Sequence, residues 1–328
     1  MLNLFRQNTL FAGILLFLIT VGLRVPAYLH LSPYEYIQNA PFARLSFTFI
    51  AALPNALFWS LMFSSALTFL QAIFLNYIVT SQGILYRDSF LPALFYVVLN
   101  SFFIQQTELT PQLISTTFIL LLFQRLCYLY ESQNPHLVVL DAGLYLGIGI
   151  LFNYDLFLFL PFILVSVVVF TSFNVRYLII SLIGILVPLY FTGIYFYVTN
   201  RLDELIGYIQ QSFESKYLRT IETNWIRLIP WGLLIPITAL SIIGLQQNFF
   251  RNKVKTRRIT QSLYLMLFFG IAGLFFENVN YIYALCYLSV PASIFVAYYF
   301  ISTNRILLKE ILFFAILGLA IYYQIARI

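Results

Sequence analysis

Long apolar stretches separated by short polar gaps run along the whole chain. Many are about 20 residues long and lack a strict alternation of apolar and polar positions. A helix needs about 20 apolar residues to cross a hydrocarbon core, whereas a membrane strand needs about ten alternating ones. The pattern predicts an all-α bundle of about 11 transmembrane spans, within a range of roughly 9 to 12. We place the spans near residues 8–23, 57–79, 90–106, 111–130, 137–152, 156–170, 177–198, 228–245, 262–276, 281–300 and 306–325.

The composition indicates that the chain is solvated mainly by lipid. Hydrophobic residues make up 61% of it and charged residues 9%. A soluble domain has about 25% charged residues because its surface must be hydrated. With so few charges, the chain cannot cover a water-soluble globule. We therefore treat residues 1–328 as a single membrane domain.

Basic residues predict the orientation, because they concentrate in cytoplasmic loops. A cytoplasmic N-terminus places 11 of the 18 basic residues inside, including a basic cytoplasmic loop at about 246–261. Two long loops, at about 24–56 and 199–227, then lie outside. We expect each outer loop to contain an interfacial helix: one over 42–56, and an amphipathic one from Leu202 onward with Asn200 as its N-cap.

Several smaller patterns indicate local structure inside the bundle. Asn153, Tyr154 and Asp155 interrupt the apolar stretch 137–170, so we expect a tight hairpin there. Gly143 and Gly147 are four residues apart, a spacing that favours close helix packing. Asp141 is either an intramembrane acid with a function or a residue at a hydrated helix N-terminus. The two cysteines, Cys127 and Cys286, lie in apolar runs and predict neither a disulfide nor a metal site.

Glu35 is the strongest candidate for chemistry, because it lies in the first outer loop beside a predicted interfacial helix. Its carboxylate could act as a general base. It is also the last residue of Ser32-Pro33-Tyr34-Glu35, which matches a capping box in which Glu35 reaches back to the Ser32 N–H. The two roles do not exclude each other.

The predicted layout begins with one span and a long acidic outer loop that contains an interfacial helix. A bundle of spans with short loops follows, and then a second long outer loop. This layout resembles that of GT-C glycosyltransferases, which transfer sugars from polyprenyl-phosphate carriers. The resemblance implies that Glu35 is the catalytic base and that basic residues on the same face bind the phosphate. On this basis Arg24, Arg201, Lys216, Arg219 and Arg227 are expected to bind the substrate. His30 is expected either to join them or to contact lipid headgroups, and Asp155 and Glu277, in short outer turns, are candidate secondary acids. We predict no metal and no cofactor.

A second resemblance rests on short motifs in the first two-thirds of the chain. These are Leu4-Phe5-Arg6, Gly22 to Pro26, Arg87 to Pro92, Asn174 to Arg176 and Gly184 to Tyr190. The chain resembles an uncharacterised family of bacterial multi-pass inner-membrane proteins. That resemblance implies a location in the bacterial inner membrane and supports the topology more than any reaction.

Three functional hypotheses follow from these patterns. The first is a GT-C-like transferase that uses a polyprenyl-phosphate-linked sugar at the outer face. The second is a non-catalytic assembly or scaffold protein of the envelope, with envelope proteins as partners. The third is a transporter, which would require polar or broken helices at mid-membrane depth. Membrane lipids are expected partners, and the net charge of +6 is better explained by orientation and anionic headgroups than by nucleic-acid binding.

Overall fold

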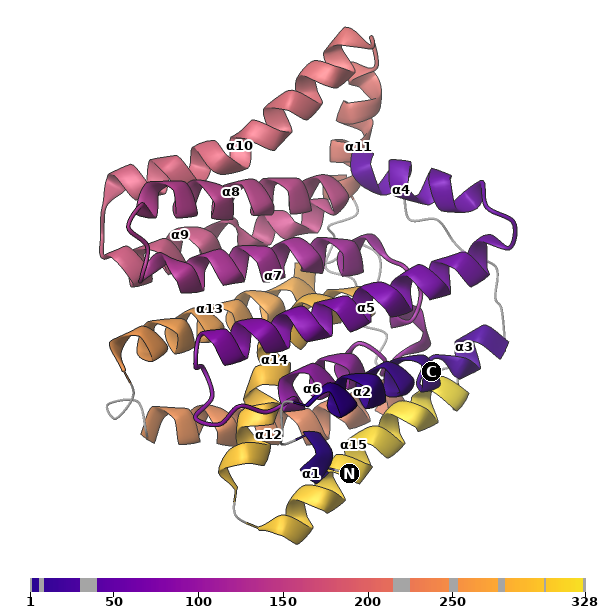
Figure 1. Cartoon of the computed structure of the whole chain (residues 1–328). Coiled ribbons are helices and arrows are strands. Elements are labelled where there is room, and N and C mark those ends of the chain that lie inside the picture. The colour runs from indigo at the N-terminus through magenta and orange to yellow at the C-terminus, as the bar shows by residue number, and fades with distance from the viewer. Residues whose placement is uncertain are drawn as a thin grey trace.

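The computed structural model describes residues 2–5, 9–29, 40–214, 225–247, 253–276, 281–303 and 305–326. Within these ranges the chain is helical and contains no strand, which confirms the predicted all-α class. Most of the long helices pack side by side in one bundle (Figure 1). The elements are α1 (Leu2–Phe5), α2 (Leu10–Gly22), α3 (Val25–Leu29), α4 (Pro41–Ala51), α5 (Ala56–Ser81), α6 (Leu91–Leu99), η1 (Ile104–Gln106), α7 (Pro111–Leu129), α8 (Pro135–Phe152), η2 (Tyr154–Phe159), α9 (Leu160–Thr171), α10 (Val175–Val198), α11 (Leu202–Glu214), α12 (Trp225–Gln247), α13 (Val254–Phe276), α14 (Tyr281–Ser302) and α15 (Ile306–Ala326).

Eight helical segments in the described residues are long and apolar enough to cross a membrane. Each corresponds to one of the predicted spans. A bundle of this kind identifies an integral membrane protein, because lipid requires the backbone groups of each span to be paired within it. The eight segments are Leu10–Leu29, Ala56–Ser81, Pro111–Leu129, Pro135–Phe152, Tyr154–Thr171, Val175–Val198, Leu285–Ser302 and Leu307–Ala326.

The other three predicted spans differ from this group. The segments predicted at 228–245 and 262–276 form α12 and α13, each of 23 residues and therefore about 34 Å long. Neither is among the eight candidates. The segment predicted at 90–106 is not one continuous helix. It forms α6, of nine residues, followed by a turn and the short 3-10 helix η1.

This discontinuous segment is tolerated because protein surrounds it. Every residue of α6 is buried, and side chains satisfy backbone groups that the broken helix leaves unpaired. The Ser60 hydroxyl accepts from the Leu109 N–H at 3.1 Å, and Gln324 donates to the Ser101 carbonyl at 2.7 Å. Irregular backbone at membrane depth is stable only with such partners. Apolar composition alone therefore predicted a crossing segment but not its break.

The bundle has two chemically different ends. The α4–α11 end contains α4, α11, the C-terminal ends of α8 and α10, and the start of η2 (Figure 1). The basic end contains the connections α7–α8 and α9–α10 and the first turns of α13. These connections are held together there: Lys255 pairs with Glu131 at 2.8 Å, and Arg258 stacks over the Tyr130 ring and donates to the Phe170 carbonyl.

Asp141 lies in the second turn of α8, toward the basic end. Its carboxylate is 3.4 Å from the Arg125 guanidinium of α7, and both side chains are partly exposed. An acid that pairs with a cation on the neighbouring helix needs no separate function to explain its position. The pairing favours a structural role for Asp141.

Helices α8 and α10 pack with almost no space between their backbones. A Cβ added to Gly143 would lie 2.4 Å from the Ser181 carbonyl oxygen, and one added to Gly147 would lie 2.5 Å from the Ile185 oxygen. From the opposite side, a Cβ on Gly184 would lie 2.6 Å from the Leu140 oxygen. These distances confirm the close packing predicted from the glycine spacing.

Candidate functional site

The predicted site residues fall into two groups. Arg24, Arg201 and Asp155 lie within the described residues, and Arg227 is in the first turn of α12, with its side chain outside the description. The other predicted residues lie outside the described residues: Glu35, His30, Lys216, Arg219 and Glu277.

The helices of the two long loops meet at the α4–α11 end. Arg44 of α4 donates to the Glu204 carboxylate of α11 at 3.2 Å and to the Tyr208 hydroxyl. The hydrogen bond that Arg44 donates to Tyr208 is the main cause that raises the pKa of Arg44, and the negative charge of Glu204 adds to it. About half of each charged side chain is exposed. Segments 160 residues apart are thus joined by a polar, accessible contact.

Arg201 lies in the turn between α10 and α11. The Arg201 N–H donates to the Phe196 carbonyl and the Asn200 N–H to the Tyr197 carbonyl, while Asn200 has a left-handed φ of 55°. This is a Schellman motif, which ends a helix. The prediction that Asn200 caps the start of α11 was therefore wrong, since Asn200 ends α10. The turn reverses the chain and leaves the Arg201 side chain exposed.

Asp155 lies at the start of η2, as the predicted hairpin between 137 and 170 requires. The Asn153 side chain forms the turn by accepting from the Asp155 N–H at 3.3 Å. Element η2 packs against α11, so Asp155 belongs to the same end of the bundle as Arg44 and Glu204. Its side chain is partly exposed.

Arg24 occupies a different environment, deep inside the bundle. Its side chain is 0% exposed, and Nη2 donates to the Thr68 hydroxyl, near the middle of α5, at 2.6 Å. Nε and Nη1 are buried and have no hydrogen-bond partner among the described residues. Charged groups inside a membrane are costly and usually functional. The two unpartnered nitrogens of Arg24 are hydrogen-bond donors that an anionic oxygen would satisfy.

Close to Arg24 lies a chain of hydrogen-bonded polar side chains that connects α5, α6 and α14. Tyr96 donates to Gln71 Oε1 at 2.8 Å, and Asn100 donates to the Ser289 hydroxyl at 2.8 Å and to the Tyr96 carbonyl at 3.1 Å. Gln71 also donates to the Leu113 carbonyl and to Thr117. These side chains come from α5, α6, α7 and α14, and we call the five of them the polar interior: Gln71, Tyr96, Asn100, Thr117 and Ser289.

A second, smaller group lies beside the hairpin of Asp155. Asn153 donates to the Tyr287 hydroxyl at 2.6 Å, and that hydroxyl is 2.8 Å from the Ser115 hydroxyl. Sequence reasoning missed both groups. The available signal was the presence of Gln71 and Asn100 inside predicted spans, because strongly polar residues at that depth need partners.

The described residues offer no cluster suited to a metal ion. No group of three or more His, Cys, Asp or Glu side chains within the described ranges could hold one. The charged groups at the α4–α11 end include Arg44, Arg201, Asp203, Glu204 and Asp155. Such a set can bind an anion or exchange a proton without a metal.

Comparison with curated proteins found no match, and comparison with solved structures also found none. The expectation that the chain belongs to an uncharacterised family is confirmed: residues 39–328 match the sequence model of the "Family of unknown function (DUF6427)", and the chain belongs to that family.

Proposed function

We propose that this integral membrane protein is a GT-C-like transferase of the bacterial inner membrane, which uses a polyprenyl-phosphate-linked sugar at the α4–α11 end. In this proposal Glu35 takes a proton from the acceptor hydroxyl. Arginine side chains stabilise the phosphate that leaves as the new glycosidic bond forms. Arg201 and Asp155 belong to the same end and are available to the substrate.

The single observation that best supports the proposal is the contact between α4 and α11. A lipid-linked substrate must be held between a membrane-embedded site and the aqueous phase, so the two long loops have to close over it together. Arg44, Glu204 and Tyr208 join the helices of these loops directly. This contact brings residues of the two loops close enough together to bind one substrate.

Arg24 provides a second line of support. A buried guanidinium with two unpartnered nitrogens has a strong preference for an anionic oxygen. A structural role alone would be unfavourable, since replacing a buried ion by an apolar side chain is often neutral or stabilising. Because the side chain is closed to solvent, substrate phosphate would reach it only after the surrounding helices separate.

The proposal is tested by substitutions made in the chromosomal gene, with surface glycolipids and protein abundance measured together. Arg24→Met keeps the apolar volume but removes the charge, and we expect normal abundance with loss of the glycolipid product. Arg24→Lys keeps the charge but loses the planar fork, so we expect most activity to be lost. Arg176→Met is the matched control, because Arg176 is exposed at the basic end.

Glu35→Gln tests the base directly. We expect glycolipid synthesis to fall by at least about 100-fold, the usual contribution of a general base. Normal glycolipids at normal abundance would contradict the transferase. A fall in abundance alone, with activity per molecule unchanged, would assign Glu35 to the capping box instead.

A second candidate, an envelope scaffold protein, is favoured by α10. Beyond the contact with α8, α10 diverges from the bundle (Figure 1). Its C-terminal half presents the exposed aromatic side chains of Tyr190, Phe191, Tyr195 and Tyr197. A photo-crosslinking residue at Tyr195 distinguishes the two candidates. Adducts with one protein of defined mass would favour the scaffold, and adducts with lipid alone would favour the transferase.

The transporter hypothesis required a broken helix and polar groups at mid-depth. Helix α6 and the polar interior have both features, but Gln71, Tyr96, Asn100 and Ser289 are all buried and bonded to one another. Among these four side chains, only Asn100 Oδ1 is buried without a partner in the described residues, so they leave few groups free to bind a transported solute. We therefore keep this hypothesis third.

A further inference from the structure

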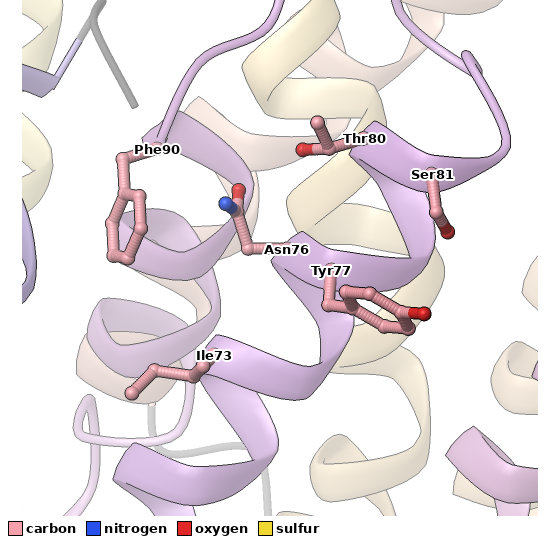
Figure 2. Close-up of a pocket in the computed structure, with 6 residues that line it drawn as sticks. All are labelled: Ile73, Asn76, Tyr77, Thr80, Ser81 and Phe90. Carbon is pink, nitrogen blue, oxygen red and sulfur yellow. The ribbon is translucent and has the colours of Figure 1, made fainter. Parts of the chain in front are cut away.

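A pocket of about 290 Å³ lies between the last turns of α5 and the residue that precedes α6 (Figure 2). It is at the end of the bundle opposite to α4 and α11, so it is separate from the proposed transferase site. Five lining residues are spaced along one side of α5, and the sixth is the N-cap of α6. The lining residues are Ile73, Asn76, Tyr77, Thr80, Ser81 and Phe90.

Two polar atoms in the pocket have no hydrogen-bond partner among the described residues. Asn76 is 3% exposed, and its Oδ1 is buried without a partner. The Thr80 hydroxyl is also buried without one. In contrast, the Ser81 hydroxyl donates to the Ile78 carbonyl of its own helix at 3.2 Å. Figure 2 shows Asn76 and Thr80 projecting from α5 toward the side on which Phe90 lies.

The open side of the pocket faces the surroundings of the bundle. Tyr77 is 59% exposed and Ile73 is 37% exposed, and α5 is one of the membrane-spanning candidates. The nine residues from Ile73 to Ser81 span about 12 Å along the helix. The pocket therefore runs from the end of the helix, at headgroup level, into the acyl region. An occupant in this position has a polar end and a hydrocarbon chain.

The unpartnered Asn76 Oδ1 and Thr80 hydroxyl indicate the chemistry of the occupant's polar end. An amide oxygen and a hydroxyl both accept hydrogen bonds, and none of the six lining residues is charged. The C-terminal end of α5 also carries a partial negative charge, so the group nearest to it in a zwitterionic headgroup is the cation and not the phosphate. A primary ammonium, which has three N–H donors, meets both conditions.

We propose that this pocket binds one membrane lipid whose headgroup carries a primary ammonium, as phosphatidylethanolamine does. The ammonium donates to Asn76 Oδ1 and to Thr80 Oγ1. Ile73, Tyr77 and Phe90 contact the upper part of one acyl chain. A volume near the lower limit of small-molecule pockets accommodates this part of the lipid and not the whole molecule.

The experiment uses the full chain, reconstituted in vesicles with equal amounts of phosphatidylethanolamine, phosphatidylcholine and phosphatidylglycerol that have identical acyl chains. Lipid that remains bound is measured by native mass spectrometry. Phosphatidylcholine is a matched ligand, because its quaternary ammonium has the same charge but no N–H donor. We expect phosphatidylethanolamine to be retained about three- to tenfold over phosphatidylcholine, the ratio typical of one hydrogen bond.

Substitutions in the pocket test whether the preference for phosphatidylethanolamine arises there. Asn76→Leu and Thr80→Val should each reduce the ratio toward one, whereas Ser81→Ala should leave it unchanged, because the Ser81 hydroxyl is satisfied within α5. Equal retention of the three lipids by the unmodified protein would overturn the proposal and indicate that water alone fills the pocket. Preferential retention of phosphatidylglycerol would also overturn it. The lipid comparison needs no variant, so a variant that fails to fold does not prevent the test.

Discussion

The contact between α8 and α10 and the polar interior around α6 hold helices together by opposite means. Between α8 and α10, glycines let backbone atoms approach so closely that no Cβ fits at Gly143, Gly147 or Gly184. Around α6, the helices are joined by side-chain hydrogen bonds such as those from Tyr96 to Gln71 and from Asn100 to Ser289. In lipid, association depends on such packing and bonding, because burying apolar surface brings no hydrophobic gain.

The difference teaches which changes each region tolerates. The α8–α10 contact fails when volume is added, because backbone cannot move aside. The polar interior fails when one partner of a hydrogen bond is removed, because the other partner is left unsatisfied away from water. Sequence changes that are neutral in one region should therefore be damaging in the other.

The largest effect is expected from Gly184→Ala. The new methyl group would lie 2.6 Å from the Leu140 carbonyl oxygen, and overpacking of this kind typically costs about 1–3 kcal/mol. Unfolding in mixed micelles, titrated with a denaturing detergent, measures the loss. Gly193→Ala is the matched control in the same helix, since nothing lies within 4 Å of its added Cβ. Equal stability of the two variants would show that α8 and α10 are not in close contact.

A smaller effect is expected from Tyr287→Phe. This change removes the hydroxyl to which Asn153 donates and which contacts Ser115, and it adds no volume. Leaving one buried polar group unsatisfied costs about 1–3 kcal/mol, with the lower part of that range usual in membranes. The same unfolding assay measures the cost.

A double variant sharpens this prediction. Replacing both partners by apolar groups can be nearly neutral, so Asn153→Leu should be less damaging in the Tyr287→Phe background than in the parent. Strict additivity of the two changes would mean that the side chains are not coupled. No such rescue is expected for the glycine contact, where the problem is volume.

The smallest effect is expected from Arg44→Met at the α4–α11 end. Its pair with Glu204 is about half exposed, and exposed pairs contribute about 0–1 kcal/mol. We expect little change in global stability but faster amide exchange in α11, measured by hydrogen–deuterium exchange. High salt should reduce the difference from the parent, because salt screens exposed charges. Unchanged exchange in α11 would show that Arg44 does not hold the two loops together.

Much of the candidate site could not be predicted from sequence, for identifiable reasons. Arg24 was predicted as a candidate from its position in an outer loop, a position that does not predict a fully buried side chain bonded to Thr68. The sequence placed Arg44 among the basic residues available to a phosphate, but it could not identify the partners Glu204 and Tyr208, which are 160 and 164 residues away. Pairing at such separation leaves no local pattern.

The sequence by itself determined that the chain is solvated mainly by lipid, that it is helical, and where most of the membrane-crossing segments lie. These properties depend on composition and on the length of apolar runs. It also predicted the glycine contact and the hairpin at Asn153, which are encoded by neighbouring residues. The tertiary structure alone decided that the segment 90–106 is broken, and that Gln71, Tyr96, Asn100 and Ser289 form one network. These features depend on partners that are distant in the sequence, and only packing brings them together.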